Sequence, residues 1–269
     1  MRAISFFQKK QLPEKRLAIR NYYEKKDQKL FSLVLFLLLL FLLIIYLIFF
    51  TPIFKIKTIS FEIKDNQMVK INENELRNEI NKILSQNFYF FPLDNIFFFP
   101  KKKIKMFLSQ DQRIENFEIK IIFPQKIKIK ISTWLPQAIF VQSSDYFLLN
   151  KNGQIIKKIP KNEVGEIDLP IIYNKTEKKD LPFLSIFNFL ERLVNSDFSI
   201  IEVRIFEDKG VLNYQAITSE GWQIYFTPEE DINSQINNLF LILREKISDR
   251  SQLDYIDLRF GNRLFYKYK

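Results

Sequence analysis

The sequence predicts an α+β protein with a single N-terminal transmembrane helix, a small βααββ domain and a mixed β-sheet domain with flanking helices. Three observations carry this prediction. Residues 30–50 form an uncharged apolar run that follows a basic tail, residues 1–29. Residues 53–133 have strand and helix patterns in the order strand, helix, helix, strand, strand. Residues 134–269 then combine short alternating strands with two amphipathic helices.

The apolar run, LFSLVLFLLLLFLLIIYLIFF, has 21 residues, of which 19 are Leu, Ile, Phe or Val. A helix of this length spans about 30 Å, the thickness of a bilayer hydrocarbon core. A buried helix so apolar on every face would need a large surrounding core. A cleaved signal peptide usually has a shorter apolar region and small residues at its cleavage site. Because Phe49-Phe50-Thr51-Pro52 offers no such site, we expect an uncleaved anchor in the lipid bilayer.

The formal charge of +10 is concentrated in the tail. Residues 1–29 carry nine basic and three acidic side chains, whereas the rest of the chain has 32 basic and 28 acidic ones. Positive residues beside a membrane helix stay on the cytoplasmic side. We therefore expect a cytoplasmic N-terminus and an extracytoplasmic bulk, which argues against nucleic acid as a partner of residues 53–269.

The composition excludes several classes of enzyme. The chain has no histidine and no cysteine, which removes histidine acid–base catalysis, thiol nucleophiles and the usual zinc or iron–sulfur ligands. Its five glycines are too widely spaced for a phosphate-binding loop, and there is no Ser-x-x-Lys. Paired carboxylates remain open by composition, but no spacing favours them. We expect no catalytic residue, no cofactor, no metal and no small-molecule substrate.

The first outer domain, residues 53–133, opens with a strand over 55–63. Asn72, with Glu75 three residues later, is typical of a helix N-cap. A short helix near residues 101–109 precedes two alternating strands, 114–122 and 125–133, which Phe123-Pro124 separates.

Two patterns in this domain each have two interpretations. An aromatic run most simply packs beneath a loop, although a ligand-binding patch or a position near lipid headgroups would use the same residues. Three alternating lysines most simply form the solvated face of a half-buried strand, although they could face anionic lipid. The aromatic residues are Phe88, Phe90, Phe91, Phe97, Phe98 and Phe99, and the lysines are Lys126, Lys128 and Lys130.

In the second outer domain, residues 134–269, we expect strands at AIFVQ, YFLL, QIIKKI, FSIIEVRIF, VLNYQAIT and WQIYFT. The segment 181–196 predicts an amphipathic helix that buries Ile186, Phe187, Leu190, Leu193 and Val194. Thr227 is the expected cap of a second helix, with Pro228 at its first position. That helix is expected to bury Ile232, Ile236, Leu239, Phe240 and Leu243.

The chain ends with YIDLRFGNRLFYKYK, which predicts two strands around a turn at Gly261-Asn262. No later strand in the sequence can cover the last one, so we expect it at a sheet edge with unpaired backbone groups. It would either bind a partner strand or only close its own sheet, with Lys267 and Lys269 discouraging further strand pairing. The candidate partner-binding residues are Tyr255, Asp257, Arg259, Phe260, Leu264, Phe265, Tyr266, Lys267 and Tyr268.

The strand and helix order after a membrane helix resembles a POTRA domain. The resemblance rests on the helix that opens at Asn72, the pair IENFEIKIIFPQKIKIKI and the following LPQAIF. The family more often has Glu-Arg where this chain has Thr133-Trp134, and Asp where Asn150 stands.

Together with the anchor and the second domain, the chain resembles the FtsQ family, called DivIB in Gram-positive bacteria. YIDLRF is the most specific motif, followed by the strand at Trp222. The resemblance implies a non-catalytic, single-pass scaffold of the cytoplasmic membrane at the division septum. It also implies that the C-terminal β region binds the small coiled-coil proteins FtsB and FtsL and so recruits or regulates septal cell-wall synthesis.

Two other functions remain as alternatives. POTRA domains also occur in secretion and envelope-assembly proteins, which normally continue into a many-stranded barrel, whereas residues 138–269 include two amphipathic helices. A membrane-anchored cell-wall hydrolase would need a nucleophile or metal set that the sequence does not show. A turnover assay on cell-wall material separates the hydrolase from the other two.

Overall fold

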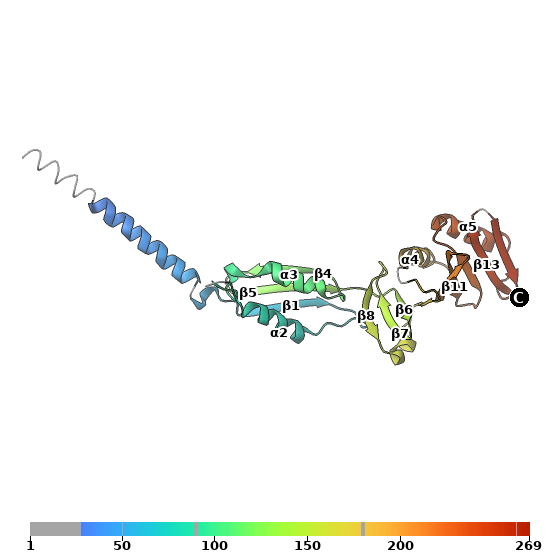
Figure 1. Cartoon of the computed structure of the whole chain (residues 1–269), viewed down its shortest axis with the longest axis horizontal. Helices are drawn as coiled ribbons and strands as arrows, with labels where there is room; N and C mark the ends of the chain where they lie inside the picture. Colours follow the sequence, from blue (N-terminus) through green and yellow to red (C-terminus); the bar gives the residue numbers. More distant parts are fainter. Residues whose placement is uncertain (1–27, 50, 89–90, 179–180, 262) are drawn as a thin grey trace, which may run out of the picture. The chain divides into compact units, whose positions relative to one another are not determined.

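The structure is a computed structural model that describes residues 28–49, 51–88, 91–178, 181–261 and 263–269, and of residues 87, 88 and 91 the backbone alone (Figure 1). Most of the basic tail and Phe50, Phe90 and Asn262 therefore lie outside the described residues. The chain divides into two compact units. The first contains the described residues up to Ser60 with Arg77–Lys101 and Lys120–Lys128, and the second contains Phe61–Leu76, Lys102–Ile119 and Ile129–Lys269.

The apolar run is helical over Gln28–Phe49, a 22-residue helix with a mean hydropathy of 3.2. In the described part of the chain it is the one helix long and apolar enough to cross a membrane, and none of it is buried in the protein. A helix that no other described part of the chain buries, and that is apolar on all sides, is suited to a lipid environment. The expected helix is thus confirmed over residues 30–49, and residue 50 lies outside the described residues.

The βααββ order of the first outer region is confirmed as well. A three-stranded sheet has the order β1-β5-β4, and the boundary between the two compact units crosses its strands. Two short strands and two 3₁₀ turns complete the region. Its elements are η1 (Pro52–Phe54), β1 (Thr58–Lys64), α2 (Glu73–Leu84), β2 (Asn87–Phe88), β3 (Phe91–Pro92), η2 (Ile96–Phe98), α3 (Lys101–Gln110), β4 (Ile114–Ile122) and β5 (Lys126–Thr133).

Local sequence explains these elements. The Asn72 side-chain oxygen accepts hydrogen bonds from the backbone N–H of Asn74 at 3.0 Å and Glu75 at 3.4 Å, so Asn72 caps α2 as expected. Along β5 every second residue is buried, so one face of this strand is covered and the lysine-bearing face is open to solvent. This supports the solvated-face interpretation of Lys128 and Lys130.

A nine-stranded mixed sheet forms the rest of the second unit, in the order β14-β13-β12-β11-β10-β9-β6-β7-β8. The β10–β9, β9–β6 and β12–β13 pairs are parallel and the others are antiparallel. The elements are β6 (Ala138–Gln142), β7 (Asp145–Leu149), β8 (Ile155–Ile159), η3 (Lys161–Glu166), β9 (Ile171–Asn174), α4 (Phe183–Arg192), β10 (Ile200–Asp208), β11 (Val211–Thr218), β12 (Gln223–Phe226), α5 (Ile232–Glu245), β13 (Leu253–Phe260) and β14 (Arg263–Tyr268).

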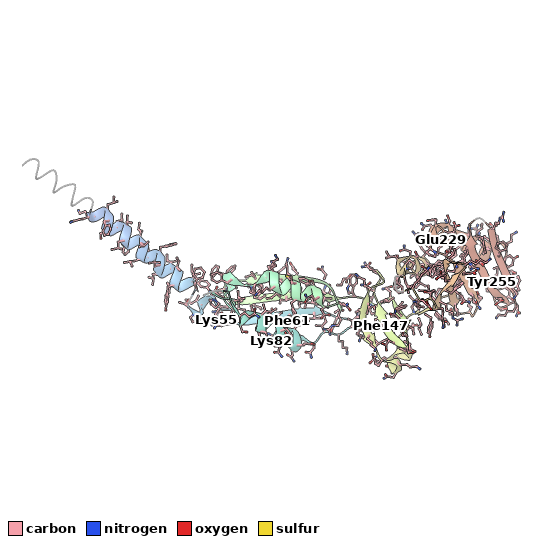
Figure 2. All side chains as sticks on the ribbon, in the orientation of Figure 1. Lys55, Phe61, Lys82, Phe147, Glu229 and Tyr255 are labelled. Carbon is pink, nitrogen blue, oxygen red and sulfur yellow. The ribbon has the colours of Figure 1, made fainter. Side chains whose placement is uncertain are left out.

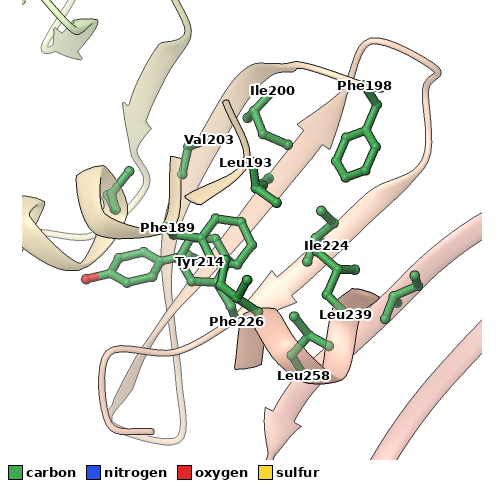
Figure 3. Packing of buried hydrophobic residues seen from close by; sticks show 14 of the residues in the cluster. Phe189, Leu193, Phe198, Ile200, Val203, Tyr214, Ile224, Phe226, Leu239 and Leu258 are labelled. Atoms are coloured by element: carbon green, nitrogen blue, oxygen red, sulfur yellow. The ribbon is translucent and has the colours of Figure 1, made fainter. Parts of the chain in front are cut away.

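The core of this sheet lies on the face that α4 and α5 cover. Phe189 of α4 stacks on Phe226 of β12, with ring centroids 3.9 Å apart, and Tyr214 packs against the same ring at 4.9 Å (Figure 3). Trp222 is completely buried in the same cluster. The fold class expected from the sequence, α+β with a mixed sheet and flanking helices, is confirmed. The domain boundaries at 53–133 and 134–269 stay a prediction.

The start of α5 differs from the expectation. The helix is capped by Asp231, whose carboxylate accepts the Ser234 N–H at 2.8 Å, and not by Thr227. Thr227 instead lies in the preceding turn, where buried Gln235 bonds to both its N–H and its C=O. Asp231, four positions later, is also of a residue type that favours N-caps, and the Gln235 amide holds Thr227 in the turn.

Two side chains expected in the core are exposed. Val194 is 75% exposed because α4 ends at Arg192, so helical spacing no longer applies to it. Phe240 is 40% exposed although its neighbour Leu239 is completely buried. Phe189, which we did not expect in the core, takes the central position on α4.

Candidate partner-binding surface

The hairpin β13–β14 brings all nine candidate residues together. β14 lies at one edge of the nine-stranded sheet and, among the described strands, pairs with β13 alone. Phe260 pairs with Arg263, so the connection has two residues, and Gly261 adopts a φ of +59° at its first position. Hairpin turns of two residues need such a φ there, which glycine adopts without strain. The expected edge position is therefore confirmed.

The outward-facing backbone groups of β14 follow from its pairing. At both register shifts the extra residue lies in β13, so β14 keeps a regular alternation. The Lys269 N–H donates to the Gln252 carbonyl at 2.9 Å, which places Lys269 on the inner side of the strand. Because inward and outward residues alternate along an antiparallel strand, the free edge carries the N–H and C=O groups of Leu264, Tyr266 and Tyr268.

Side chains of the same three residues lie on the helix-covered face. Tyr266 pairs with Ile256, a core residue, and directly opposed residues share a sheet face. Leu264 packs against the core, whereas Tyr266 and Tyr268 are each 40% exposed at its rim. The two tyrosine rings contact edge to face at 5.7 Å.

The opposite face of the sheet, which neither α4 nor α5 covers, carries a second aromatic group. We call it the open face and define it by Phe206, Tyr225, Tyr255, Arg259, Phe260 and Phe265. Tyr225 contacts Tyr255 at 5.6 Å, and Phe260 contacts Phe265 at 5.4 Å (Figure 2 labels Tyr255). Phe260 and Phe265 are 53% and 50% exposed.

Arg259 is held at the centre of the open face. Its guanidinium makes a bidentate pair with Asp257, at 2.8 Å from Nε and 2.6 Å from Nη2. The ring centroids of Tyr225, Phe260 and Phe206 lie 5.1–6.0 Å from the guanidinium carbon, within cation–π range. The hydrogen bond with Asp257 raises the pKa of Arg259 further above its usual value, against the effect of burial. The arginine is therefore a fixed cation that orders three aromatic rings.

Charge at the hairpin is largely paired within the chain. Asp257 is buried beneath Arg259, and the Lys267 ammonium lies 3.2 Å from the Asp254 carboxylate. What the hairpin presents to solvent is mainly aromatic surface beside free backbone groups. Two members of the open face, Phe206 and Tyr225, were missed in the sequence. The period-two alternation of WQIYFT would have placed Tyr225 opposite the core, whereas a register shift between Ile200 and Glu202 breaks the alternation before Phe206.

The described side chains form no metal-binding group. No group of three acidic side chains is arranged to hold a metal ion in that part of the chain. Burial raises the pKa of the Tyr214 phenol, and this side chain is part of the core. A groove of about 910 Å³ beside α4 is lined by none of the nine candidate residues.

Comparison with known proteins agrees with this architecture. Residues 138–259 match the family described as "Cell division protein FtsQ/DivIB, C-terminal". The match ends at Arg259, so β14 lies beyond it. The chain is also similar to the cell division protein DivIB of Clostridium tetani, with 24% identity over 228 residues that cover 78% of each chain.

The elements of the chain follow the order expected from the sequence. One apolar helix precedes a βααββ region, which precedes a mixed sheet flanked by two helices. The family model, over residues 138–259, and the relative, over 78% of the chain, support membership of this chain in the FtsQ/DivIB family of cell division proteins.

Proposed function

We propose that this protein is a non-enzymatic, single-pass scaffold of the bacterial division machinery. Its β14 edge binds a strand from a small membrane-anchored division protein of the FtsB/FtsL type. This binding recruits or regulates septal cell-wall synthesis. The observation that carries the proposal is the free edge of β14, where Leu264, Tyr266 and Tyr268 direct backbone donors and acceptors outward.

Strand addition supplies a physical basis for such binding. Main-chain hydrogen bonds from a partner strand satisfy the edge, and side chains on alternate faces set the register. The edge here has aromatic side chains on both faces: Tyr266 and Tyr268 on one, and Phe260 and Phe265 on the other. Aromatic anchors of this kind dominate the energy of many interfaces.

The proposed topology places this edge outside the cytoplasm. The helix Gln28–Phe49 crosses the membrane once, and the basic tail before it stays in the cytoplasm. Protease added outside cells with a permeable wall should digest residues 53–269 and spare the tail. Protection of residues 53–269 would reverse the topology.

Two proline variants test the docking edge. Tyr266→Pro removes an outward donor, and proline is tolerated at sheet edges, so partner binding should weaken while thermal unfolding changes little. Phe265→Pro is the matched control, because its N–H faces β13 and its loss should lower the melting temperature. Binding is measured by co-purification of the full chain with an FtsB/FtsL-type partner from the same organism. Unchanged binding by a folded Tyr266→Pro variant would exclude β14 as the docking edge.

A further inference from the structure

The end of the membrane helix is hydrogen-bonded to the first outer region. The Asn95 side-chain amide donates to the Ile48 carbonyl at 2.9 Å and lies 3.5 Å from that of Phe49. The last carbonyls of a helix lack partners within the helix, and at a membrane surface they need another donor. Asn95 is 2% exposed, and its carbonyl oxygen accepts the Phe97 N–H at 3.0 Å. One buried side chain thus ties the helix end to η2.

Aromatic rings extend this junction to the β4–β5 turn. Phe49 contacts Phe98 at 4.9 Å, and Phe97 contacts both Phe54 at 5.0 Å and Phe123 at 5.7 Å. The Gln125 amide also bonds to the carbonyls of residues 52 and 53, at 3.1 and 3.0 Å. All these residues belong to the same compact unit as the helix. The turn is therefore held close to the point where the chain leaves the helix.

Four large apolar side chains of this junction are exposed. We call them the helix-exit surface: Ile53, Phe97, Ile122 and Phe123, with exposed fractions of 53%, 48%, 42% and 60%. Two exposed lysines adjoin them. The backbone N–H of Lys57 donates to the backbone carbonyl of Gln125, and Lys126 follows Gln125 in the sequence. Lys55 pairs with Asp94 at 2.9 Å (Figure 2 labels Lys55). Apolar side chains rimmed by basic ones are typical of protein surfaces that lie in a membrane interface.

We propose that the helix-exit surface lies in the headgroup region of the bilayer that the helix Gln28–Phe49 crosses. A 22-residue helix is about 33 Å long, close to the thickness of the hydrocarbon core, so Phe49 reaches the membrane surface. Side chains bonded or packed to that end lie at the same depth. The bilayer is the one occupant continuous with the helix, and the lysines suit anionic headgroups.

Contact between the helix-exit surface and the bilayer has a consequence beyond anchoring. A single helix leaves a domain free to pivot, whereas a second contact through the helix-exit surface fixes the height of the first outer region above the bilayer. The inference rests on the proposed membrane crossing, and not on the partner-binding edge.

Tryptophan probes in the full chain test whether the helix-exit surface lies in the headgroup region. The chain is placed in nanodiscs of phosphatidylcholine and phosphatidylglycerol, with bromine atoms on the acyl chains either near the headgroup or near the bilayer centre. Phe123→Trp reports on the surface, and Ile122→Trp is a second probe in case the first misfolds. Phe41→Trp reports on the membrane helix, and exposed Val194→Trp is the control outside the membrane. The signal of wild-type Trp134 and Trp222 is subtracted.

The Phe123→Trp probe should show blue-shifted emission and lose most intensity with bromine near the headgroup. Phe41→Trp should lose most with bromine near the centre, and Val194→Trp should lose none. If Phe123→Trp fluorescence is insensitive to bromine at both depths while Phe41→Trp is quenched, the helix-exit surface does not lie in the bilayer. If the Phe123→Trp emission is blue-shifted but insensitive to bromine, the helix-exit surface is covered by protein and not by lipid. An unquenched Phe41→Trp would refute the membrane crossing itself.

Discussion

Two pairs of aromatic rings in one sheet differ in what covers them: Tyr214 and Phe226 of β11 and β12, and Phe260 and Phe265 of the β13–β14 hairpin. Tyr214 and Phe226 are completely buried beneath α4 and α5, whereas Phe260 and Phe265 are about half exposed on the open face. The residue types are the same, and the difference lies in what covers them. Covered rings stabilise the fold, and uncovered rings beside a free strand edge are available to a partner.

The largest expected effect tests the covered rings. Phe226→Ala removes the ring that stacks on Phe189 and contacts Tyr214. Truncation of a fully buried phenylalanine costs about 3–5 kcal/mol of unfolding free energy. Denaturant unfolding of residues 53–269, followed by near-UV circular dichroism, measures it. A loss below about 1 kcal/mol would mean that the core repacks around the missing ring and that this comparison overstates its importance.

Arg259→Ala tests what holds the uncovered rings of the open face in place. The change leaves the buried Asp257 carboxylate without its bidentate partner, which should cost about 1–3 kcal/mol of stability. Arg259→Lys is the matched control, because it keeps a positive charge and loses the fork geometry. If Arg259→Lys unfolds at the same denaturant concentration as the wild type, charge alone orders the open face and the bidentate geometry adds nothing.

Phe265→Ala tests the uncovered rings. Its ring is half exposed, so the unfolding free energy should fall by less than about 1 kcal/mol. Partner affinity should fall by about 1 kcal/mol or more if Phe265 anchors the proposed strand. Calorimetric titration with an FtsB/FtsL-type protein measures the affinity, and a larger change in stability than in affinity would place Phe265 with the structural rings instead.

The smallest effect is expected at Phe240. This ring is 40% exposed on α5, so Phe240→Ala should change stability by less than about 1 kcal/mol. Leu239→Ala, one residue away and completely buried, should cost about 2–5 kcal/mol. Equal losses in paired denaturant titrations would show that exposure does not separate the two classes of side chain. Phe240→Ala should also leave partner binding unchanged, because α5 lies on the other face of the sheet from Phe265.

Local patterns in the sequence were sufficient for most elements. The membrane helix follows from composition and length alone, since transfer of apolar side chains into lipid needs no tertiary partner. The Asn72 cap and the two-residue hairpin at Gly261 also follow from local chemistry, because each satisfies backbone groups within a few residues.

Tertiary structure decided the rest. It ended α4 before Val194, and it chose Asp231 over Thr227 as the cap of α5, where the Gln235 amide holds Thr227 in the preceding turn. Strand order and the inward or outward direction of each β14 donor depend on pairing between distant segments. A period of two shows which residues share a face, but not which face is covered. That is why the sequence by itself determined the hairpin, its alternation and its edge position, while the fold decided which backbone groups of β14 face outward, those of Leu264, Tyr266 and Tyr268.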